Sequence, residues 1–226
     1  MQFERTERLI GKENLKKIKN KNVIIFGVGG VGSYVVESLA RVGVGNLTVV
    51  DSDVVSESNL NRQIIALHST IGKPKVDVIK NRVLDINPNA KIKAIKQFVT
   101  KENITEFNLK EYDYVIDAID NISVKVELAV LSQKHQFNLI SCMGTGNKLK
   151  PELFSITDIF KTSVCPLAKV MRKELKARDV KKLTVLYSQE QPINASGNRI
   201  PASISFTPSI AGLRMAEYVI MQFIKE

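Results

Sequence analysis

Hydrophobic residues in the first two thirds of the chain follow two alternating patterns. Short runs of β-branched and other apolar residues, such as residues 22–26, are typical of strands that are buried on both faces of a sheet. Between these runs lie stretches with apolar residues at helical spacing, as in residues 75–86, where Val76, Ile79 and Val83 share one face. Repeated strand–helix–strand units predict a Rossmann-like doubly wound α/β fold, with a mostly parallel sheet and helices on both faces.

The whole chain divides into predicted elements without an intervening linker. In the first part we expect strands at residues 22–26, 47–50, 91–98, 112–118 and 137–142, and helices at about residues 31–42, 75–86 and 123–136. In the last third we expect strands at 153–156, 184–187 and 202–205, helices at 166–178 and 208–225, and a loop at 188–203. We therefore expect a single domain over residues 1–226, in which the C-terminal strands extend the same sheet.

The composition is that of an ordinary globular protein, with 226 residues, 44% hydrophobic and 25% charged. No apolar run approaches the ~18 residues that cross a bilayer, and no apolar stretch follows the charges at the N-terminus, so we expect a cytoplasmic protein without a membrane contact. Two cysteines and two histidines are too few for a four-cysteine zinc site or a histidine-rich metal centre. The net charge of +10 fits a polyanionic partner such as nucleic acid, and equally a lysine-rich solubilising surface.

A glycine-rich turn follows the first predicted strand and opens a helix. Gly27, Gly29 and Gly32 have the G-x-G-x-x-G spacing, with Gly30 between them. Glycines at these places allow a sharp turn and the close approach of a phosphate, which the helix N-terminus favours. Asp51 ends the second predicted strand, where a carboxylate can accept hydrogen bonds from ribose hydroxyls. The pattern predicts a nucleotide site, but it fits ATP and NAD equally, and a turn needed only for packing is the alternative.

Charged residues after the later strands distinguish between the two nucleotides. Arg62, Lys75 and Asp120 are all predicted near the carboxyl ends of strands, which face one crevice in an open α/β sheet. Transfer of a nucleotidyl group develops negative charge on the phosphates, which fixed cations and a carboxylate-bound metal stabilise, whereas hydride transfer does not. Each residue alone also fits a solvated charge or a helix cap. Together they favour ATP over an NAD-dependent oxidoreductase or a non-catalytic nucleotide sensor.

These motifs, in this order and spacing, resemble the ubiquitin-activating-enzyme-like superfamily of the ThiF, MoeB and HesA type over residues 3–146. Its members adenylate a carboxylate with Mg-ATP, usually as homodimers. The resemblance implies that Arg62 and Lys75 contact ATP phosphates, that Asp51 binds ribose, and that Asp120 is tied to nucleotide and Mg²⁺. The implied nucleotide-binding residues are Gly27, Gly29, Gly30, Gly32, Asp51, Asp53, Asn59, Arg62, Lys75, Asp120 and Asn121.

The superfamily also has an arginine near the N-terminus that reaches into the ATP site of the partner subunit. Counting back from Gly11 makes Arg5 the better match, and Arg8 is the alternative. The resemblance therefore implies a catalytic role for Arg5 in a homodimer. An ordinary charged N-terminal helix would explain the same residues.

Cysteine usage bears on which carboxylate is activated. Relatives that act on ubiquitin-like or sulfur-carrier proteins often carry two Cys-x-x-Cys pairs and a transfer cysteine, and this sequence lacks both pairs. Cys165 lies about where a transfer cysteine would, but Pro166 follows it and no obvious base is adjacent. We therefore expect Cys165 to be a partly buried small residue, and Cys142, after a predicted strand, to be buried as well.

The chain is also similar, nearly to its end, to the tRNA threonylcarbamoyladenosine dehydratase subfamily. The similarity rests on residues 5–7, 30–34, 61–64, 157–159, 166–172 and 200–206. It implies that ATP adenylates the threonyl carboxylate of the modified adenosine, that an internal nitrogen attacks, and that AMP leaves without an enzyme thiol. It further implies an ATP-binding part at about 1–146, a tRNA-contacting part at about 147–226, and a sulfur-relay protein as a further partner. Adenylation of a sulfur-carrier C-terminus is the alternative.

A predicted helix in the last third offers a surface for tRNA. One face carries a basic stripe of Lys169, Arg172, Lys173 and Lys176. An apolar face expected to dock the helix comprises Leu167, Val170, Met171 and Leu175. Such a stripe follows a phosphate backbone with salt-sensitive affinity and no sequence readout, and a solvated helix face is the alternative. The aromatic residues show no base-stacking motif.

Overall fold

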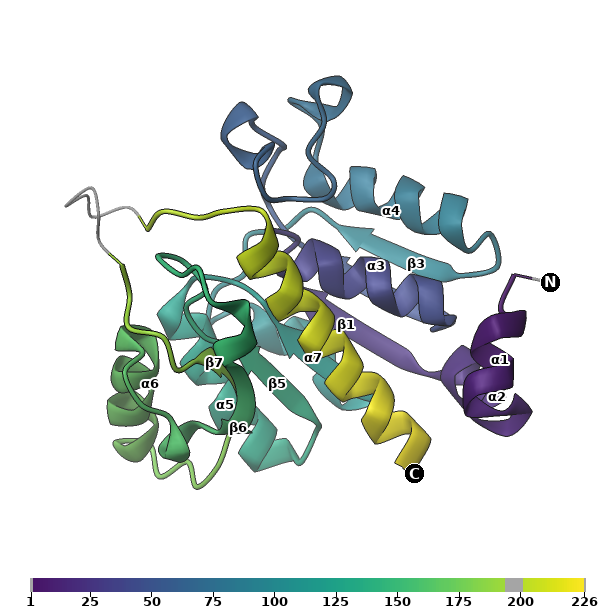
Figure 1. The fold of residues 1–226 in the computed structure, drawn as a ribbon. Coiled ribbons are helices and arrows are strands. Elements are labelled where there is room, and N and C mark those ends of the chain that lie inside the picture. The colour runs from purple at the N-terminus through teal and green to yellow at the C-terminus, as the bar shows by residue number, and fades with distance from the viewer. Residues whose placement is uncertain (1, 194–200, 226) are drawn as a thin grey trace.

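The computed structural model describes residues 2–193 and 201–225, which form one seven-stranded sheet (Figure 1). Its strands are β1 (Asn22–Phe26), β2 (Asn46–Val50), β3 (Lys91–Ile95), β4 (Tyr114–Asp117), β5 (Leu139–Cys142), β6 (Phe154–Asp158) and β7 (Thr184–Ser188). The spatial order is β3-β2-β1-β4-β5-β7-β6, and every pairing is parallel except that of β6 with β7. The predicted doubly wound fold is confirmed, and the C-terminal strands extend the same sheet.

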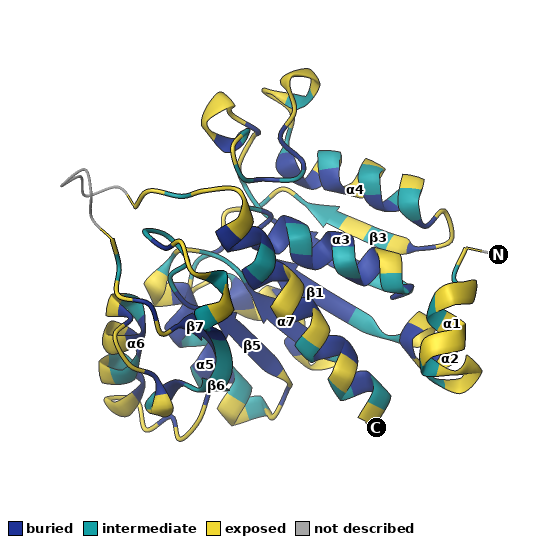
Figure 2. Ribbon diagram, viewed as in Figure 1, coloured by how far each residue is buried: buried dark blue, intermediate teal, exposed yellow. Residues whose placement is uncertain are grey.

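Helices cover both faces of this sheet. They are α1 (Glu4–Ile10), α2 (Lys12–Asn20), α3 (Gly32–Val42), α4 (Lys75–Ile86), α5 (Ile122–His135), α6 (Pro166–Lys176) and α7 (Phe206–Lys225). Residues of α2, α3, α4 and α7 share one buried cluster with one face of the sheet, and residues of α5 and α6 share a second cluster with the other face. Strand β1 is buried on both faces, because Ile25 points into the first cluster and Ile24 into the second (Figure 2).

Most predicted strands lie within two residues of the observed bounds at each end, but two predictions differ more from the structure. The predicted strand at 91–98 ends at Ile95, and Phe98 beyond it is 65% exposed. The predicted strand at 202–205 is wrong, because residues 201–205 contain no strand. The segment bonds to loops and not to a strand, since Ala202 pairs with Asn147 and the carbonyl oxygen of Ser203 accepts from Asn61. The predicted loop at 188–203 starts one residue too early, because β7 includes Ser188, and residues 194–200 of that loop lie outside the described residues.

Two short helices that the pattern did not predict as elements, α1 and α2, precede the sheet at the amino end of β1 (Figure 1). Among the described residues, no helix combines the length and apolar character that a membrane crossing requires. Strand order reverses between β1 and β4, because β2 and β3 lie on one side of this point and β5 on the other. The carboxyl ends of the strands open a crevice at such a point, which is where ligands bind in doubly wound folds.

Candidate functional site

A cavity of about 580 Å³ lies at this reversal of strand order. Every predicted nucleotide-binding residue except Gly32 lines it: Gly27, Gly29, Gly30, Asp51, Asp53, Asn59, Arg62, Lys75, Asp120 and Asn121. A second cavity of about 730 Å³ lies at the opposite, amino ends of the strands, against Tyr114 and Tyr218, and none of the predicted nucleotide-binding residues lines it. The chemistry-bearing motifs therefore converge on the cavity at the carboxyl ends of the strands.

The glycine turn between β1 and α3 cannot carry side chains at two positions. Gly27 has φ +88°, and a Cβ there would lie 2.7 Å from the carbonyl oxygen of Ala118, directly after β4. A Cβ on Gly32 would lie 1.8 Å from the carbonyl oxygen of Gly27, so Gly32 packs beneath the turn instead of facing the cavity. Gly29 has only Gln63 within 4 Å of such an atom, which leaves the turn open to a ligand.

Asp51, directly after β2, is hydrogen-bonded to the backbone on both of its carboxylate oxygens. Its Oδ2 accepts from the N–H of Val28 at 2.6 Å, and its Oδ1 accepts from the N–H of Asp53 at 2.8 Å. Each carboxylate oxygen has a further lone pair that can accept a ribose hydroxyl. Asp51 thus ties the glycine turn to β2 in addition to facing the cavity, a contact that the motif did not predict.

Lys75 is the first residue of α4, and its ammonium group is held at the cavity wall. Its Nζ lies 2.7 Å from Oδ2 of Asp53, and its backbone N–H donates to the carbonyl oxygen of Asp53 at 3.0 Å. The Lys75 side chain is 6% exposed whereas that of Asp53 is 63% exposed. The lysine stem is therefore buried, and its charge is fixed at the boundary between the protein and the cavity.

Arg62 lies in the loop after β2, and its position depends on neighbours in the same loop. Its Nη1 donates to the carbonyl oxygen of Ser58 at 2.8 Å and to Oδ1 of Asn61 at 2.9 Å. The buried Asn59 holds the loop, since its Oδ1 accepts from the N–H of Ser56. Within residues 2–193 and 201–225 the Arg62 guanidinium has no carboxylate partner, so its charge is available to an anion in the cavity.

Gln63 is a cavity residue to which the sequence assigned no role. Its side chain is buried, and its Oε1 has no hydrogen-bond partner among the described residues. A buried polar atom without a partner is costly unless a water or ligand supplies one. The motif that contains Arg62 included Gln63, but only the packing shows that its amide oxygen is unpaired.

Asp120 and Asn121, at the start of α5, have different roles. Asn121 is the N-cap, because its Oδ1 accepts from the N–H groups of Ser123 at 3.0 Å and Val124 at 3.4 Å. Asp120 does not cap the helix and lies exposed at the cavity. The described residues contain no cluster of three metal-binding side chains. One carboxylate suits Mg²⁺ held jointly with nucleotide phosphates, because Mg²⁺ commonly takes only one or two protein carboxylates.

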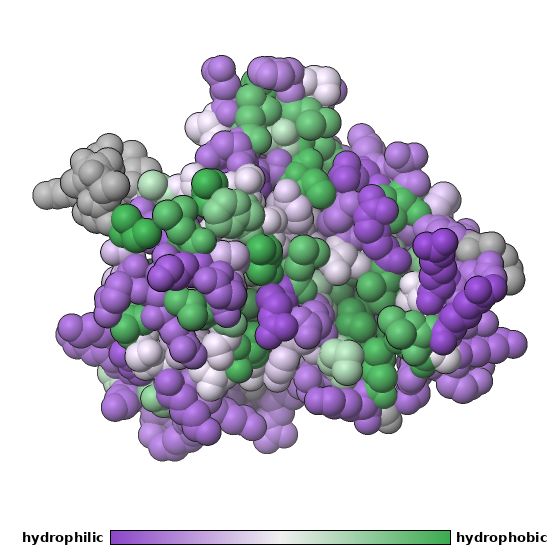
Figure 3. All heavy atoms as spheres, viewed as in Figure 1, coloured by the Kyte–Doolittle hydropathy of each residue, from purple (hydrophilic) through white to green (hydrophobic). Residues whose placement is uncertain are grey.

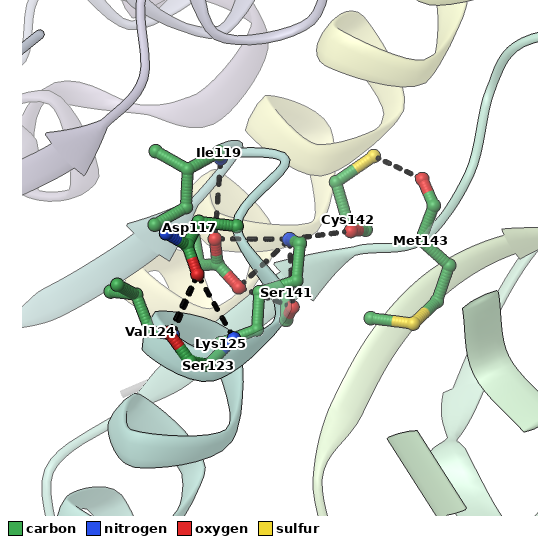
Figure 4. Close-up of polar contacts among 9 residues, drawn as sticks. Asp117, Ile119, Ser123, Val124, Lys125, Ser141, Cys142 and Met143 are labelled. Carbon is green, nitrogen blue, oxygen red and sulfur yellow. Dashed lines mark hydrogen bonds and ion pairs between the residues drawn. The ribbon is translucent and has the colours of Figure 1, made fainter. Parts of the chain in front are cut away.

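A buried ion pair beneath the cavity was missed at the sequence level (Figure 4). Lys125 Nζ lies 3.0 Å from both carboxylate oxygens of Asp117 and 2.8 Å from the carbonyl oxygen of Cys142. Ser141 Oγ donates to Asp117 at 2.5 Å, and the N–H of Ile119 donates at 3.3 Å. These contacts join the ends of β4 and β5 to the first turn of α5. A lysine between Val124 and Val126 was the available signal.

Arg5 does not reach the cavity of its own chain. It lies exposed on α1, at the amino end of β1, and the cavity is at the carboxyl end (Figure 1). Arg5 has no ion-pair partner within the described residues, whereas Arg8 pairs with Glu4 at 2.5 Å. If either arginine acts at an ATP site, that site must belong to another subunit.

Both cysteines are buried, as expected for Cys142, whereas Cys165 is buried more completely than the predicted partial burial. Burial raises the pKa of the Cys142 thiol to about 12, because the thiolate would be poorly solvated there. Cys165, the N-cap of α6, has a thiol that is also removed from solvent. Within the described residues, neither thiol is exposed for sulfur or acyl transfer.

Only three of the four residues of the predicted basic stripe on α6 are exposed to solvent. Lys169, Lys173 and Lys176 are exposed, but Arg172 is half-buried and its Nη1 donates to both oxygens of Thr162. The predicted apolar face needs a correction, because Val170 is 42% exposed. The face that packs inward consists of Ala168, Met171 and Leu175. Val170 is rotated about 100° from Met171 around the helix, which places it outside this narrow face.

The chain resembles known proteins over nearly its full length. A match to the ThiF family covers residues 3–224. The tRNA threonylcarbamoyladenosine dehydratase of Bacillus subtilis is 44% identical, and the match covers 100% of this chain and 95% of that protein. Crystal structures of the Escherichia coli tRNA N6-threonylcarbamoyladenosine dehydratase, TcdA, in complex with ATP and with AMP each superpose with a TM-score of 0.93. They are 30% and 29% identical, covering 99% of this chain and 94% of theirs.

Proposed function

The chain belongs to the ThiF family, and from this premise we propose that it converts threonylcarbamoyladenosine in tRNA to its cyclic, dehydrated form in an ATP-dependent reaction. The observation that carries the proposal is the 44% identity to the Bacillus subtilis dehydratase across this whole chain. The cavity is consistent with it, because Arg62 and Lys75 bring two cations to one nucleotide-sized hollow. The proposed substrate is a tRNA, so the proposed place of action is the cytoplasm.

The reaction has two steps in which the cavity residues have distinct tasks. An oxygen of the threonyl carboxylate attacks the α-phosphorus of ATP, and pyrophosphate leaves. An internal nitrogen then attacks the acyl carbon, loses its proton and expels AMP, so the nucleoside has lost one water. Arg62 and Lys75 stabilise the negative charge that develops on the phosphates, since fixed cations need no reorganisation during the step. Asp51 orients the ribose through its remaining lone pairs.

Asp120 is the proposed protein ligand of Mg²⁺. When bound, the ion would neutralise phosphate charge and polarise the α-phosphate. The fit rests on one exposed carboxylate at the cavity, next to the glycine turn. Asn121 keeps Asp120 available for this task because it takes over the capping of α5.

Nucleoside mass spectrometry of tRNA incubated with the protein and ATP tests the proposed function. We expect the threonylcarbamoyl nucleoside to lose one water only when ATP is present, with one AMP formed per conversion. Unchanged nucleoside after complete incubation would contradict the proposal. ATP–pyrophosphate exchange that depends on a sulfur-carrier protein would then support the alternative adenylyltransferase, although both thiols are buried.

A homodimer is the proposed assembly, and its surface is proposed to include α7. Leu213 and Met221 on α7, with Phe206 and Leu149 near its amino end, are exposed apolar residues. Figure 3 shows hydrophobic side chains gathered over this helix and the loops at its start. Such a patch on an otherwise polar surface suits a second copy of the chain. The resemblance also suggests a sulfur-relay partner, for which neither buried thiol offers an accessible acceptor.

Mixing two inactive variants tests whether Arg5 acts in the partner subunit. In a mixed dimer of Arg5→Ala and Lys75→Met chains, one of the two sites would have an intact Arg5 and an intact Lys75. We expect each variant alone to be inactive and an equal, re-equilibrated mixture to recover about a quarter of wild-type AMP formation. An Arg8→Ala chain serves as the control and should stay active by itself. No recovery in the mixture would contradict action across the interface.

Charge reversal on α6 tests the proposed tRNA surface. We expect Lys169, Lys173 and Lys176 changed together to Glu to weaken tRNA binding and to lower its salt dependence by about one unit of slope per lost phosphate contact. Arg172 is left intact because its contact with Thr162 is structural. ATP affinity should not change, since none of the three lysines lines the cavity. Unchanged tRNA affinity in a filter-binding assay would rule out this surface.

A further inference from the structure

Asn147 holds both described ends of the long connection between β7 and α7. The N–H of Ile193 donates to the carbonyl oxygen of Asn147 at 2.8 Å, and the N–H of Asn147 donates to the carbonyl oxygen of Ala202 at 2.8 Å. The side chain adds a third bond, because its Oδ1 accepts from the N–H of Ala202 at 2.7 Å. One residue thus fixes where the chain leaves the sheet region and where it returns.

The residues after Asn147 strengthen the same attachment. Lys148 Nζ donates to the carbonyl oxygen of Glu190 at 2.5 Å, and the Glu190 carboxylate accepts from the N–H of Leu149 at 3.0 Å. Thr207 Oγ1 donates to the carbonyl oxygen of Lys148 at 3.0 Å. Lys148, Glu190 and Thr207 are buried, so these bonds are shielded from water. Residues 147–149 therefore form a rigid anchor and not a chance surface contact.

Residues 201–203, which we call the strap, are positioned by this anchor. Pro201 and Ser203 of the strap line the cavity. On one side the strap packs against Gly146, where a Cβ would lie 2.7 Å from Pro201. On the other side, the carbonyl oxygen of Ser203 accepts from Asn61 Nδ2 at 3.2 Å. The strap is thus held between Asn147 with its neighbours and the loop that carries Arg62.

The strap forms the part of the cavity wall that the nucleotide motifs do not supply. Gly144 and Thr145, just before the anchor, line the same side of the cavity as the strap. Under the proposed function the acyl group must enter from this side, because the glycine turn, Asp51 and Lys75 occupy the other. We propose that Asn147 is a positioning residue that holds the strap as the acceptor-side wall and so sets how the threonyl group of tRNA is presented. This inference rests on the proposed function.

The backbone of Asn147 makes a clean test available. Its φ is +59°, a left-handed conformation that asparagine, aspartate and glycine tolerate better than other residues. Asn147→Gly keeps this conformation and removes the side-chain acceptor for Ala202. Asn147→Asp keeps both the conformation and the acceptor. A difference between these two variants therefore reports the Oδ1 bond and not backbone strain.

Steady-state kinetics with modified tRNA provide the first readout. We expect Asn147→Gly to raise the KM for tRNA by about three- to tenfold, the effect of one lost hydrogen bond, while the KM for ATP changes less than about twofold. Asn147→Asp should remain within about twofold of wild type in both. An unchanged KM for tRNA, an equal rise in both constants, or an Asn147→Asp variant as impaired as Asn147→Gly would overturn the inference.

Amide hydrogen exchange provides a readout that does not depend on activity. We expect Asn147→Gly to speed exchange of the Ala202 N–H by on the order of tenfold. The N–H of Ile193 is the internal control, because its acceptor is the backbone oxygen of Asn147 and should persist. If the wild-type protein leaves tRNA unconverted, the proposed function fails, and exchange still decides whether Asn147 holds the strap. Equal Ala202 exchange in wild type and variant would overturn the attachment itself.

Discussion

Replacing Lys75 by methionine is expected to lower AMP formation on modified tRNA by on the order of 100- to 1,000-fold, as removal of one charged stabiliser of a transition state does elsewhere. The Lys75 ammonium is fixed 2.7 Å from Asp53 at the cavity wall, and methionine fills the space of its buried stem without the charge. The fold should survive, because Asp53 is 63% exposed and water can solvate it. Single-turnover assays of AMP release measure the effect, and thermal unfolding checks stability.

Lys73→Met is the matched control for this variant. Lys73 lies two residues away, is exposed and does not line the cavity, so its loss should leave the rate within about twofold of wild type. Arg62→Ala should reproduce the loss expected for Lys75→Met, because Arg62 brings to the same cavity a guanidinium that has no carboxylate partner among the described residues. Turnover at the wild-type rate in both the Lys75 and Arg62 variants would show that these cations do not stabilise the phosphates.

Replacing Lys125 by methionine is expected to lower the free energy of unfolding by about 3–5 kcal/mol, because the Asp117 carboxylate would stay buried without its counter-ion. Both side chains are almost completely removed from water, so no solvent can take the place of the ammonium group. For a chain of this length, the loss corresponds to a melting temperature lower by roughly 6–20 °C. Chemical denaturation measures the free energy directly.

Two further variants identify the cause of this loss. Lys134→Met removes an exposed lysine from the same helix and should change stability by less than about 0.5 kcal/mol. Adding Asp117→Asn to Lys125→Met removes the uncompensated charge, while the amide oxygen can still accept from Ser141. The double variant should regain at least half of the lost stability. A double variant less stable than Lys125→Met alone would contradict the explanation by charge burial.

The sequence predicted the bounds of elements with a strong apolar periodicity closely, but not those of elements with a weak periodicity. Helix α4 and strand β1 have the predicted bounds, because each combines a regular apolar pattern with a clear end signal. The predicted strand at 202–205 failed, because alternation in the sequence does not decide whether a segment pairs with a strand or, as Ala202 and Ser203 do, with loops. Val170 was misplaced for a similar reason, because only the docking angle of α6 decides how wide its buried face is.

The sequence also identified the charged residues of the cavity, but not the contacts that hold them in position. Motif spacing indicated Gly27, Asp51, Arg62 and Lys75, because each follows a strand whose carboxyl end can be inferred from local pattern. The bonds from Asp51 to the glycine turn and the unpaired oxygen of Gln63 had no local signal. They depend on which loops meet in space, and that is decided by strand order.

Local order along the chain was enough to determine a doubly wound sheet, a glycine turn after its first strand, and two cations near its strand ends, because these properties depend on neighbours in sequence. Only the tertiary structure decided that Lys125 neutralises Asp117, that Asn147 holds the strap, and that Arg5 lies far from its own cavity. Asn147 and Ala202 are distant in the chain, and Lys125 and Asp117, although close in sequence, share their site with Ser141 and Cys142 of β5, so these contacts are set by how seven strands are ordered and packed.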